Sequence, residues 1–416
     1  EKEFIVFTGS ESAYLTASGW PQQEAKFYGG LDVDRFGNVY LATQNSSYTV
    51  VVEKYDPNGN LIWHSQPFAS SLGPDDLAVD SSGNVFIVGS AGSAGFVYKL
   101  NTTTGEYENG YTFASGGSVY AFAVGVDKDD NVYVAGDTGG DLFSSPNGTM
   151  NIWIAKLDNN CNLIRGKQLT KTGFQRLYNK EALTFDIDGN VYIAGYTDAS
   201  TFGTNQGGDD AFVAKFTPDL ALTSPSFQFS CQWDDFAEDV AVDIYGNIYV
   251  VGGAEDVNYF DYGFIYKFDK AGNFIDSKVI GTNEVLSIVT EKDGTFYVVT
   301  YSGTISKYTT DLNLIWSKSL SWDYRYKLVL GQDGALYAAG DGGTLGSYAK
   351  VIKLQDARAP AIAFDQAGSI YVNQSSAMVA GTSDPDVMVS LASDGLSLVG
   401  AVEYPSSGQW RMTIDG

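Results

Sequence analysis

The sequence predicts an all-β protein whose main body is a seven-bladed β-propeller. Three observations lead to this prediction: a hairpin phrase recurs along the chain, each copy is followed by a strand ending in Lys, and no long stretch shows helical periodicity. The composition agrees, because the 416 residues include 27 Tyr, 24 Phe and 47 Gly. Such a mixture favours short strands joined by tight turns.

The hairpin phrase is an alternating apolar run, a turn rich in Asp, Asn and Gly, and a second alternating run, as in LDVDRFGNVYLA at 31–42. Each second run has an aromatic residue at its centre. The seven instances are Tyr40, Phe86, Tyr133, Tyr192, Tyr249, Tyr297 and Tyr337. Successive spacings of 46, 47, 59, 57, 48 and 40 residues each suit one four-stranded blade.

A second phrase supplies the other two strands of each blade. It is an apolar strand that ends in Lys54, Lys99, Lys156, Lys215, Lys267, Lys307 or Lys353. A turn such as DPNGN (56–60) and a strand such as LIWHS (61–65) then complete most blades. The seventh blade lacks this last strand, so we expect the N-terminal segment EFIVFT (3–8) to close the ring of residues 1–355.

The paired phrases, D-x-x-GNVYVxG followed by AFVAKLDxxGNLxW, resemble the bacterial SBBP repeats of seven-bladed β-propellers. The resemblance extends over the whole predicted propeller, and the sevenfold recurrence makes it specific as an architecture. It implies an extracellular or envelope location and a scaffold or binding role. It implies no catalytic residues.

Residues 356–416 predict a second domain, a partial Ig-like β-sandwich. The segment IAFDQAGSIYV (362–372) looks like an eighth hairpin copy, but no strand ending in Lys follows it. The continuation at 379–414 resembles bacterial Ig-like modules of large surface adhesins, with matches at Gly381, Pro385, Val387, Val389, Gly395, Gly408 and Trp410. A complete module would need strands after Ile414, so either this sequence is a fragment or the sandwich is completed from elsewhere.

The net charge of −25 argues against nucleic acids and anionic membrane surfaces as partners, because both would repel the chain. Membrane insertion is not expected either, since the sequence has no run of about 18 apolar residues. Together with the two resemblances, these properties favour an extracellular or cell-surface protein.

The sequence offers few parts for catalysis. Its single histidine, His64, falls on a predicted outer strand, where it could neither form a multi-histidine zinc site nor occupy the centre of a catalytic triad. No Walker loop, HExxH motif or nucleophile elbow is present. We therefore expect the protein not to be an enzyme.

Calcium is the one cofactor that the sequence suggests. The turn at Asp186, Asp188 and Asn190 offers oxygen ligands at alternate positions, but it lacks the twelfth-position acid of an EF-type loop, and Asp and Asn commonly cap β-turns. A better metal candidate is the junction between the two domains. Its oxygen ligands would come from Asp356, Asp384 and Asp386.

Ligand binding is expected on one face of the propeller. Short turns within hairpins fall on one face, so the loops between hairpins and between blades fall on the other, where long loops on a rigid scaffold usually carry function. Aromatic platforms and polar contacts there come from Trp233, Asp234, Asp235, Trp322, Asp323, Tyr259, Phe260 and Arg176. Exposed aromatics beside carboxylates suit carbohydrate or protein recognition, although the same rings could instead pack between blades.

The leading hypothesis is a non-enzymatic binding or structural module of a bacterial surface or secreted adhesin, with a surface polymer or a protein as its partner. A first alternative is a polysaccharide lyase or hydrolase that uses paired carboxylates. A second is a subunit of an extracellular filament, in which the incomplete Ig-like module accepts a strand from a like subunit.

Overall fold

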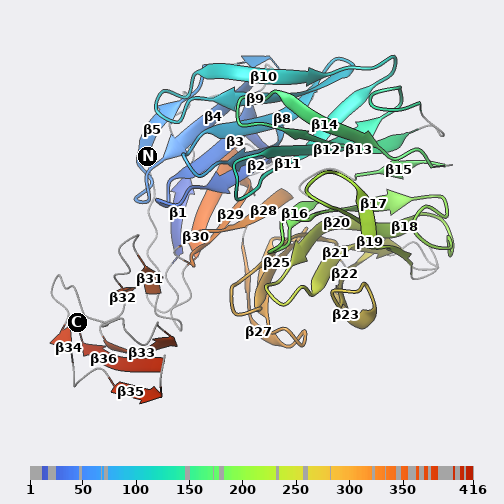
Figure 1. Ribbon diagram of the computed structural model, residues 1–416. Coiled ribbons are helices and arrows are strands. Elements are labelled where there is room, and N and C mark those ends of the chain that lie inside the picture. Colours follow the sequence, from blue (N-terminus) through green and yellow to red (C-terminus); the bar gives the residue numbers. More distant parts are fainter. Residues whose placement is uncertain are drawn as a thin grey trace.

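The computed structural model shows a ring of antiparallel β-sheets, and every regular element in its described part is a strand (Figure 1). The described residues of the ring are 12–354 apart from 17–24, 46–48, 67, 70–73, 146–149, 172, 178–181, 231–233, 256–260, 282, 321–323, 333 and 343–347. Beyond the ring they are 362–364, 370–372, 376–382, 397–398, 403–406 and 409–415. Within these residues, no helix is long and apolar enough to cross a membrane.

The first three blades follow the predicted order, with each strand pairing antiparallel to the next. The first blade contains β2 (Ala25–Val33), β3 (Val39–Asn45), β4 (Thr49–Tyr55) and β5 (Leu61–His64), with the short β6 (Phe68–Ala69) also on β4. The second contains β7 (Pro74–Val79), β8 (Val85–Ala91), β9 (Ala94–Leu100) and β10 (Tyr107–Phe113). The third contains β11 (Val119–Val126), β12 (Val132–Thr138), β13 (Asn151–Leu157) and β14 (Leu163–Gln168).

The remaining blades complete the predicted total of seven. In the fourth, the inner strand is divided into β15 (Gln175–Arg176) and β16 (Leu183–Phe185), followed by β17 (Val191–Thr197), β18 (Asp210–Phe216) and β19 (Leu222–Phe229). The fifth contains β20 (Asp235–Val242), β21 (Ile248–Glu255), β22 (Asp261–Phe268) and β23 (Phe274–Ile280). The sixth contains β24 (Val285–Thr290), β25 (Phe296–Thr300), β26 (Thr304–Tyr308) and β27 (Leu314–Ser319), and the seventh begins with β28 (Tyr324–Leu330), β29 (Leu336–Gly342) and β30 (Tyr348–Leu354).

An N-terminal strand closes the ring, but it is not the predicted segment. The strand β1 (Ser12–Thr16) pairs antiparallel with β30 as the outer strand of the seventh blade, whereas residues 3–8 lie outside the described residues. Chain length explains the difference. The connection from β1 to β2, residues 17–24, is similar in length to the connection from the outer strand of the third blade to the inner strand of the fourth, residues 169–174. A closing strand at 3–8 would have required a much longer connection, residues 9–24.

The seven blades are held by one repeated arrangement of side chains. The aromatic residue in the second strand is at most 2% exposed in each blade, and the Lys ammonium of the third strand lies over its ring at 4.8 to 5.8 Å from the centroid. The pairs are Tyr40–Lys54, Phe86–Lys99, Tyr133–Lys156, Tyr192–Lys215, Tyr249–Lys267, Tyr297–Lys307 and Tyr337–Lys353. Such cation–π contacts gain strength where water is excluded.

An acidic residue in the first turn completes this arrangement in most blades, and we call the three residues together an aromatic–lysine unit. In the first blade, Asp34 Oδ1 accepts the backbone N–H groups of Phe36 and Asn38 at 2.9 Å each. Its Oδ2 accepts the Asn38 side chain at 2.7 Å and the Tyr40 hydroxyl at 3.0 Å. The corresponding residues in the next blades are Asp80, Asp127, Asp186, Asp243 and Glu291, and the seventh blade has Gly331.

The turn at Asp186 shows the predicted backbone capping. Its Oδ1 accepts the N–H groups of Asp188 and Asn190 at 3.0 and 2.9 Å, and its Oδ2 lies 3.2 Å from the Lys215 ammonium. These bonds occupy the oxygens that a calcium ion would need. No group of three or more His, Cys, Asp or Glu side chains in the described part of the chain is arranged to hold a metal.

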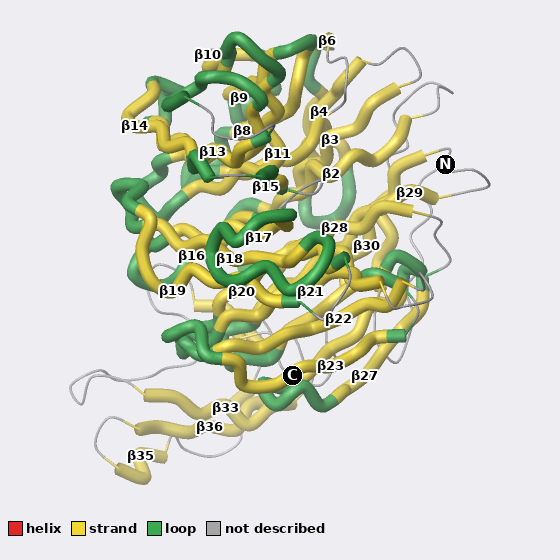
Figure 2. Tube along the Cα trace, turned by 90° about the vertical axis from the view of Figure 1, so that its right-hand side faces the viewer, coloured by secondary structure: helices red, strands yellow, loops and turns green. Residues whose placement is uncertain are grey.

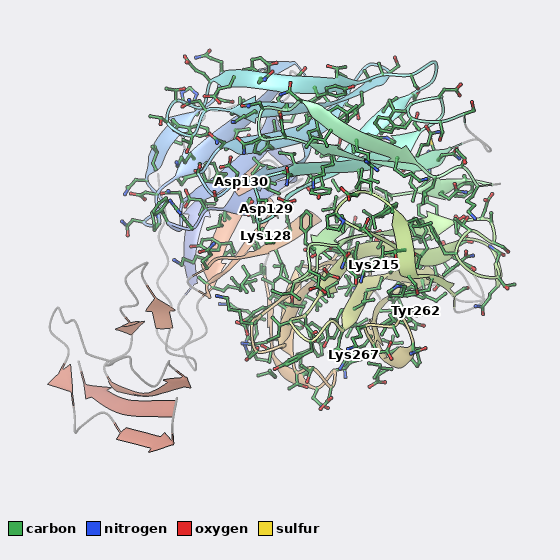
Figure 3. The ribbon with its side chains drawn as sticks, viewed as in Figure 1. Lys128, Asp129, Asp130, Lys215, Tyr262 and Lys267 are labelled. Atoms are coloured by element: carbon green, nitrogen blue, oxygen red, sulfur yellow. The ribbon has the colours of Figure 1, made fainter. Side chains whose placement is uncertain are left out.

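Several of the lysines also connect their blade to the next one. The Lys54 ammonium donates to the Thr102 carbonyl at 3.2 Å, and Lys267 donates to the Thr310 carbonyl at 2.7 Å. Both carbonyls belong to the turn between the third and fourth strands of the following blade. Figure 3 shows Lys215 and Lys267 at equivalent positions on two neighbouring blades. The aromatic–lysine units therefore fix the interior of each blade and its contact with its neighbour.

The predicted second domain is only partly described. The strands β31 (Ile362–Phe364) and β32 (Ile370–Val372) form a hairpin, and β33 (Ser376–Thr382) pairs with β36 (Gln409–Asp415), which also pairs with β34 (Ser397–Leu398) and β35 (Glu403–Ser406). The described strands of this region form a hairpin and a small antiparallel sheet, and by themselves they do not establish the expected Ig-like sandwich. The candidate calcium ligands Asp356, Asp384 and Asp386 lie outside the described residues.

The sixth and seventh blades offer a matched test of the aromatic–lysine unit. The Lys307 ammonium lies 2.7 Å from a Glu291 carboxylate oxygen that is mostly buried. We expect Lys307→Met to lower the free energy of unfolding by about 2–4 kcal/mol, because it leaves that carboxylate without its counter-charge. Urea denaturation followed by tryptophan fluorescence measures the loss.

The control is Lys353→Met in the seventh blade, where Gly331 stands at the position of the acidic residue in the other blades. Its expected loss is about 1 kcal/mol, the value of a cation–π contact. Equal losses for the two variants would show that the carboxylate contributes nothing to the unit.

Candidate binding site on the loop face

The two faces of the ring differ in the kind of connection that they carry. The turns between first and second strands and between third and fourth strands fall on one side, which we call the turn face. The connections between second and third strands and between successive blades fall on the other, the loop face. In Figure 2 the strands are yellow, and the turns and loops that connect them at either end are green. The longest connections in the ring, including 139–150 and 198–209, are on the loop face.

The structure describes three of the predicted ligand-binding residues. Arg176 lies in β15 with its side chain exposed, and Asp234 is half-buried directly before β20. Asp235 begins β20 but is only 1% exposed, and its Oδ2 accepts the Ser230 hydroxyl at 2.8 Å. Asp235 therefore supports the loop instead of facing a ligand, contrary to the prediction. The other predicted residues, Trp233, Trp322, Asp323, Tyr259 and Phe260, lie outside the described part of the chain.

Arg176 is held in place by the strand beside it. Its guanidinium hydrogen-bonds to the side chain of Tyr196, the residue that it faces across β15 and β17. This hydrogen bond and the nearby carboxylate of Asp137 hold the pKa of Arg176 above its usual value. An exposed cation that is positioned in this way loses little side-chain freedom when a ligand binds.

Two tyrosines lie near Arg176, namely Tyr196 and Tyr120, and each of them contacts at least one further aromatic ring. Tyr196 packs edge-to-face on Phe174 and on Phe236, with ring centroids 5.7 and 5.0 Å apart. In the third blade, Tyr120 stacks on Phe122 at 5.8 Å. The side chains of Phe174, Phe236, Tyr120 and Phe122 are all partly accessible. We call Arg176, these four residues and Tyr196 the loop-face cluster.

The sequence analysis missed the aromatic members of this cluster. It looked for aromatics within long loops, whereas Tyr120 and Phe236 lie near the start of the inner strands β11 and β20. The sequence did contain a pattern that could have revealed them, because each is an aromatic residue placed directly after a connection between two blades. Because the inner strands of successive blades contact one another around the ring, such residues from the third, fourth and fifth blades come together.

A group of carboxylates borders the cluster. The backbone N–H of Asp209 donates to Asp234 Oδ1 at 2.8 Å, and the N–H of Phe174 donates to Asp198 Oδ1 at 2.8 Å. Burial, and then the charges of Asp234, Asp198 and Asp210, raise the pKa of Asp209 to about 6. The nearby Arg176 only partly offsets this effect. Asp209 thus holds a proton more readily than an ordinary aspartate.

Other buried carboxylates on the inner and second strands join neighbouring blades. Asp32 Oδ2 accepts the N–H of Val79 at 2.7 Å, and Asp239 Oδ2 accepts the N–H of Ile288 at 2.9 Å. Burial raises the pKa of Asp32 to about 6 and that of Asp239 to about 7. Each of these oxygens accepts a hydrogen bond from a backbone N–H of the next blade, which indicates that the two carboxyl groups have a structural role.

Two further carboxylates belong to the same kind of contact. Asp76 forms an ion pair with Lys327 of the seventh blade, and its Oδ2 accepts the N–H of Val124 at 2.8 Å. Asp137 Oδ1 accepts the N–H of Leu177 at 2.9 Å, and burial raises the pKa of Asp137 to about 8. These bonds link blades on both sides of the loop-face cluster and keep its residues in position.

Fold and contacts together define an all-β, seven-bladed β-propeller, and the known proteins that it resembles are propellers. The SBBP family, described as a beta-propeller repeat, matches residues 110–144 and 181–203. The WD40 repeats of RRP9 superpose with a TM-score of 0.57 at 12% identity, over 85% of this chain and 100% of theirs. The WD40 beta-propeller domain of Doa1 gives 0.53 at 12% identity, over 83% of this chain and 98% of its own. No curated protein matches the chain in sequence.

The raised carboxyl pKa values predict a stability that depends on pH in an uncommon direction. In the folded protein Asp239 and Asp137 hold their protons up to about pH 7 and about pH 8, whereas the unfolded chain releases them near pH 3.8. The folded state therefore binds more protons between these limits. We expect the free energy of unfolding to fall as the pH rises from about 4 to 8.

Urea unfolding at a series of pH values measures how far the free energy of unfolding falls between about pH 4 and 8. The variants Asp137→Asn and Asp239→Asn should each make this fall smaller by at least about 1 kcal/mol. Around Asp239 the facing groups are Ser287, the Ile288 N–H and Lys327, and none of them is altered. The control is Asp129→Asn, which removes one exposed negative charge. A decline of the same size in all variants would contradict the assignment.

Proposed function

We propose that this protein is a non-enzymatic binding module of a bacterial cell-surface or secreted, adhesin-like protein, and that it holds a glycan or protein ligand at the loop-face cluster. The observation that carries the proposal is the exposed Arg176, positioned by Tyr196 beside further, partly accessible aromatic rings. The extracellular location rests on the resemblance of the repeats to SBBP propellers.

The chemistry of the cluster suits a ligand that has both apolar faces and polar edges. Aromatic rings can pack on the apolar face of a sugar or on an apolar side chain. The Arg176 guanidinium supplies several fixed hydrogen-bond donors. Asp209 and Asp234 supply acceptors beside it. A small number of placed polar groups among aromatics is typical of ligand-binding surfaces.

The location of the cluster supports binding by a rigid surface. Four of its six residues lie on inner strands, Tyr196 lies on the second strand β17, and Phe174 directly precedes β15. The backbone there is fixed by sheet pairing and by the buried carboxylates that join the blades. A binding surface on strands keeps its geometry without a ligand, which lowers the entropy lost on association.

Binding to an array of bacterial surface glycans, and to extracts of cell-surface proteins, tests the proposal. We expect at least one ligand whose affinity falls about tenfold or more in Arg176→Ala and in Phe174→Ala, since arginine and aromatic residues commonly dominate binding energy. The matched control is Lys128→Ala, which removes an exposed cation from the turn face (Figure 3). Loss of binding in the control alone, or no ligand at all, would refute the proposal.

A second candidate function is a polysaccharide hydrolase or lyase that uses carboxyl groups. Asp209 is the observation that favours it, because a carboxyl group with a pKa of about 6 that lies beside a second carboxyl group, that of Asp234, could act as a general acid. Assays of reducing-end and unsaturated-product release from the bound glycan distinguish the two functions. The binding module releases nothing, whereas an enzyme loses about a hundredfold of its rate in Asp209→Asn and keeps its affinity.

A further inference from the structure

The outer strand of the fifth blade, β23, has an unusual exposed edge. It is the last strand of its sheet, and in the described part of the chain only β22 pairs with it. Phe274 is 57% exposed, Ile275 is 47% exposed and Val279 is 64% exposed. A long apolar edge of this kind is a template for pairing with another strand.

The outer strands of three other blades carry features that discourage such pairing. β19 contains Pro225, which has no N–H to donate, and β5 has only four residues. β14 carries Arg165 and Lys167, two charges of the same sign. β23 has seven residues, no proline, and one acidic and one basic residue that balance each other. Its edge is therefore the least protected of these outer strands.

The backbone at the middle of β23 has a donor that points away from its sheet. The N–H of Ser277 donates to the side chain of the preceding Asp276 at 2.8 Å, in an exposed position. This N–H is consequently not part of the ladder with β22. In a regular antiparallel strand the residues two positions away point their backbone groups to the same side, so Val279 shares this orientation. Before Ser277 the ladder with β22 contains a β-bulge between Phe274 and Asp276, where Ile275 has no direct partner.

The sequence of β23 complements itself when two copies run antiparallel. A register centred on Ser277 places it opposite the same residue of the second copy. It also places Asp276 opposite Lys278, Ile275 opposite Val279, and Phe274 opposite Ile280. Opposite charges and apolar side chains that face each other directly across two strands are stabilising, and like charges are not. The pair of Asp276 and Lys278 occurs twice because of the twofold symmetry.

We propose that β23 is a self-association site, at which two copies of this protein pair edge to edge in an antiparallel register centred on Ser277. The two fifth-blade sheets then form one continuous sheet across the dimer. Each Asp276 carboxylate leaves the Ser277 N–H and meets the Lys278 ammonium of the second copy. Within one copy that ammonium lies 5.8 Å from the centroid of the Tyr308 ring of the sixth blade. The Ser277 N–H meets the carbonyl of its counterpart instead. The contact is isologous, so it ends at a dimer and does not propagate.

The association should be weak, because one pair of strands buries a small area and two molecules of charge −25 repel each other. It is therefore best measured by sedimentation velocity on the whole chain, at about 0.15 M salt to screen the overall repulsion, over a range of protein concentrations. We expect a reversible monomer–dimer equilibrium. An unmodified protein that stays monomeric up to about 1 mM would overturn the proposal.

Charge reversal tests the register. Asp276→Lys and Lys278→Asp each place like charges opposite one another and should weaken dimerisation about tenfold or more. The double variant Asp276→Lys with Lys278→Asp restores opposite charges and should recover most of the affinity. Ser277→Pro removes the outward N–H without breaking the ladder with β22, and should abolish dimerisation. Single variants that dimerise as well as the unmodified protein, or a double variant that fails to recover, would refute this register.

Discussion

The structure depends above all on placing a lysine ammonium over a buried aromatic ring in each blade. Burial alone disfavours the charged form, and it lowers the pKa of Lys54 despite the carboxylate of Asp34. At Lys307 burial acts in the same direction, but the hydrogen bond to Glu291 reverses it and raises the pKa. The ring face replaces part of the water that each ammonium loses, and in most blades an acceptor of the next blade or a turn carboxylate replaces more of it. Because the next blade supplies one of these partners, the unit ties local strand pairing to the assembly of the ring.

This arrangement explains why the blades tolerate differences in sequence. The second blade has Phe86 where others have Tyr, and its Lys99 donates to the Asn159 side chain of the third blade at 2.7 Å. The seventh blade has Gly331 in place of the acid. Any single partner can change as long as the ammonium keeps a ring and an acceptor. The ring contact is the part that all seven blades share.

The sequence was sufficient to predict the blades because each recurring phrase encodes a local structure. An alternating run before and after an Asp-Gly or Asn-Gly turn specifies a hairpin through contacts between neighbours in the chain. The closing strand was misplaced because pairing of β1 with β30 joins segments far apart in sequence, and alternation alone does not choose between two N-terminal segments. The partners of Arg176 were missed for the same reason: Tyr120 and Phe236 come from other blades, and only the geometry of the ring brings them near.

The large negative charge also has a structural origin in this fold. Asp34 and Asp56, in the two turns of the first blade, both accept backbone N–H groups through one carboxylate oxygen. Repeating this chemistry around the ring accumulates carboxylates whose oxygens are already occupied, so net charge is a poor guide to cation binding here. The charge still acts at long range, where it repels polyanions and like copies. Against that background Arg176 is an exposed cation that Tyr196 holds in position, and this local exception is the reason that we propose the loop face as the binding surface.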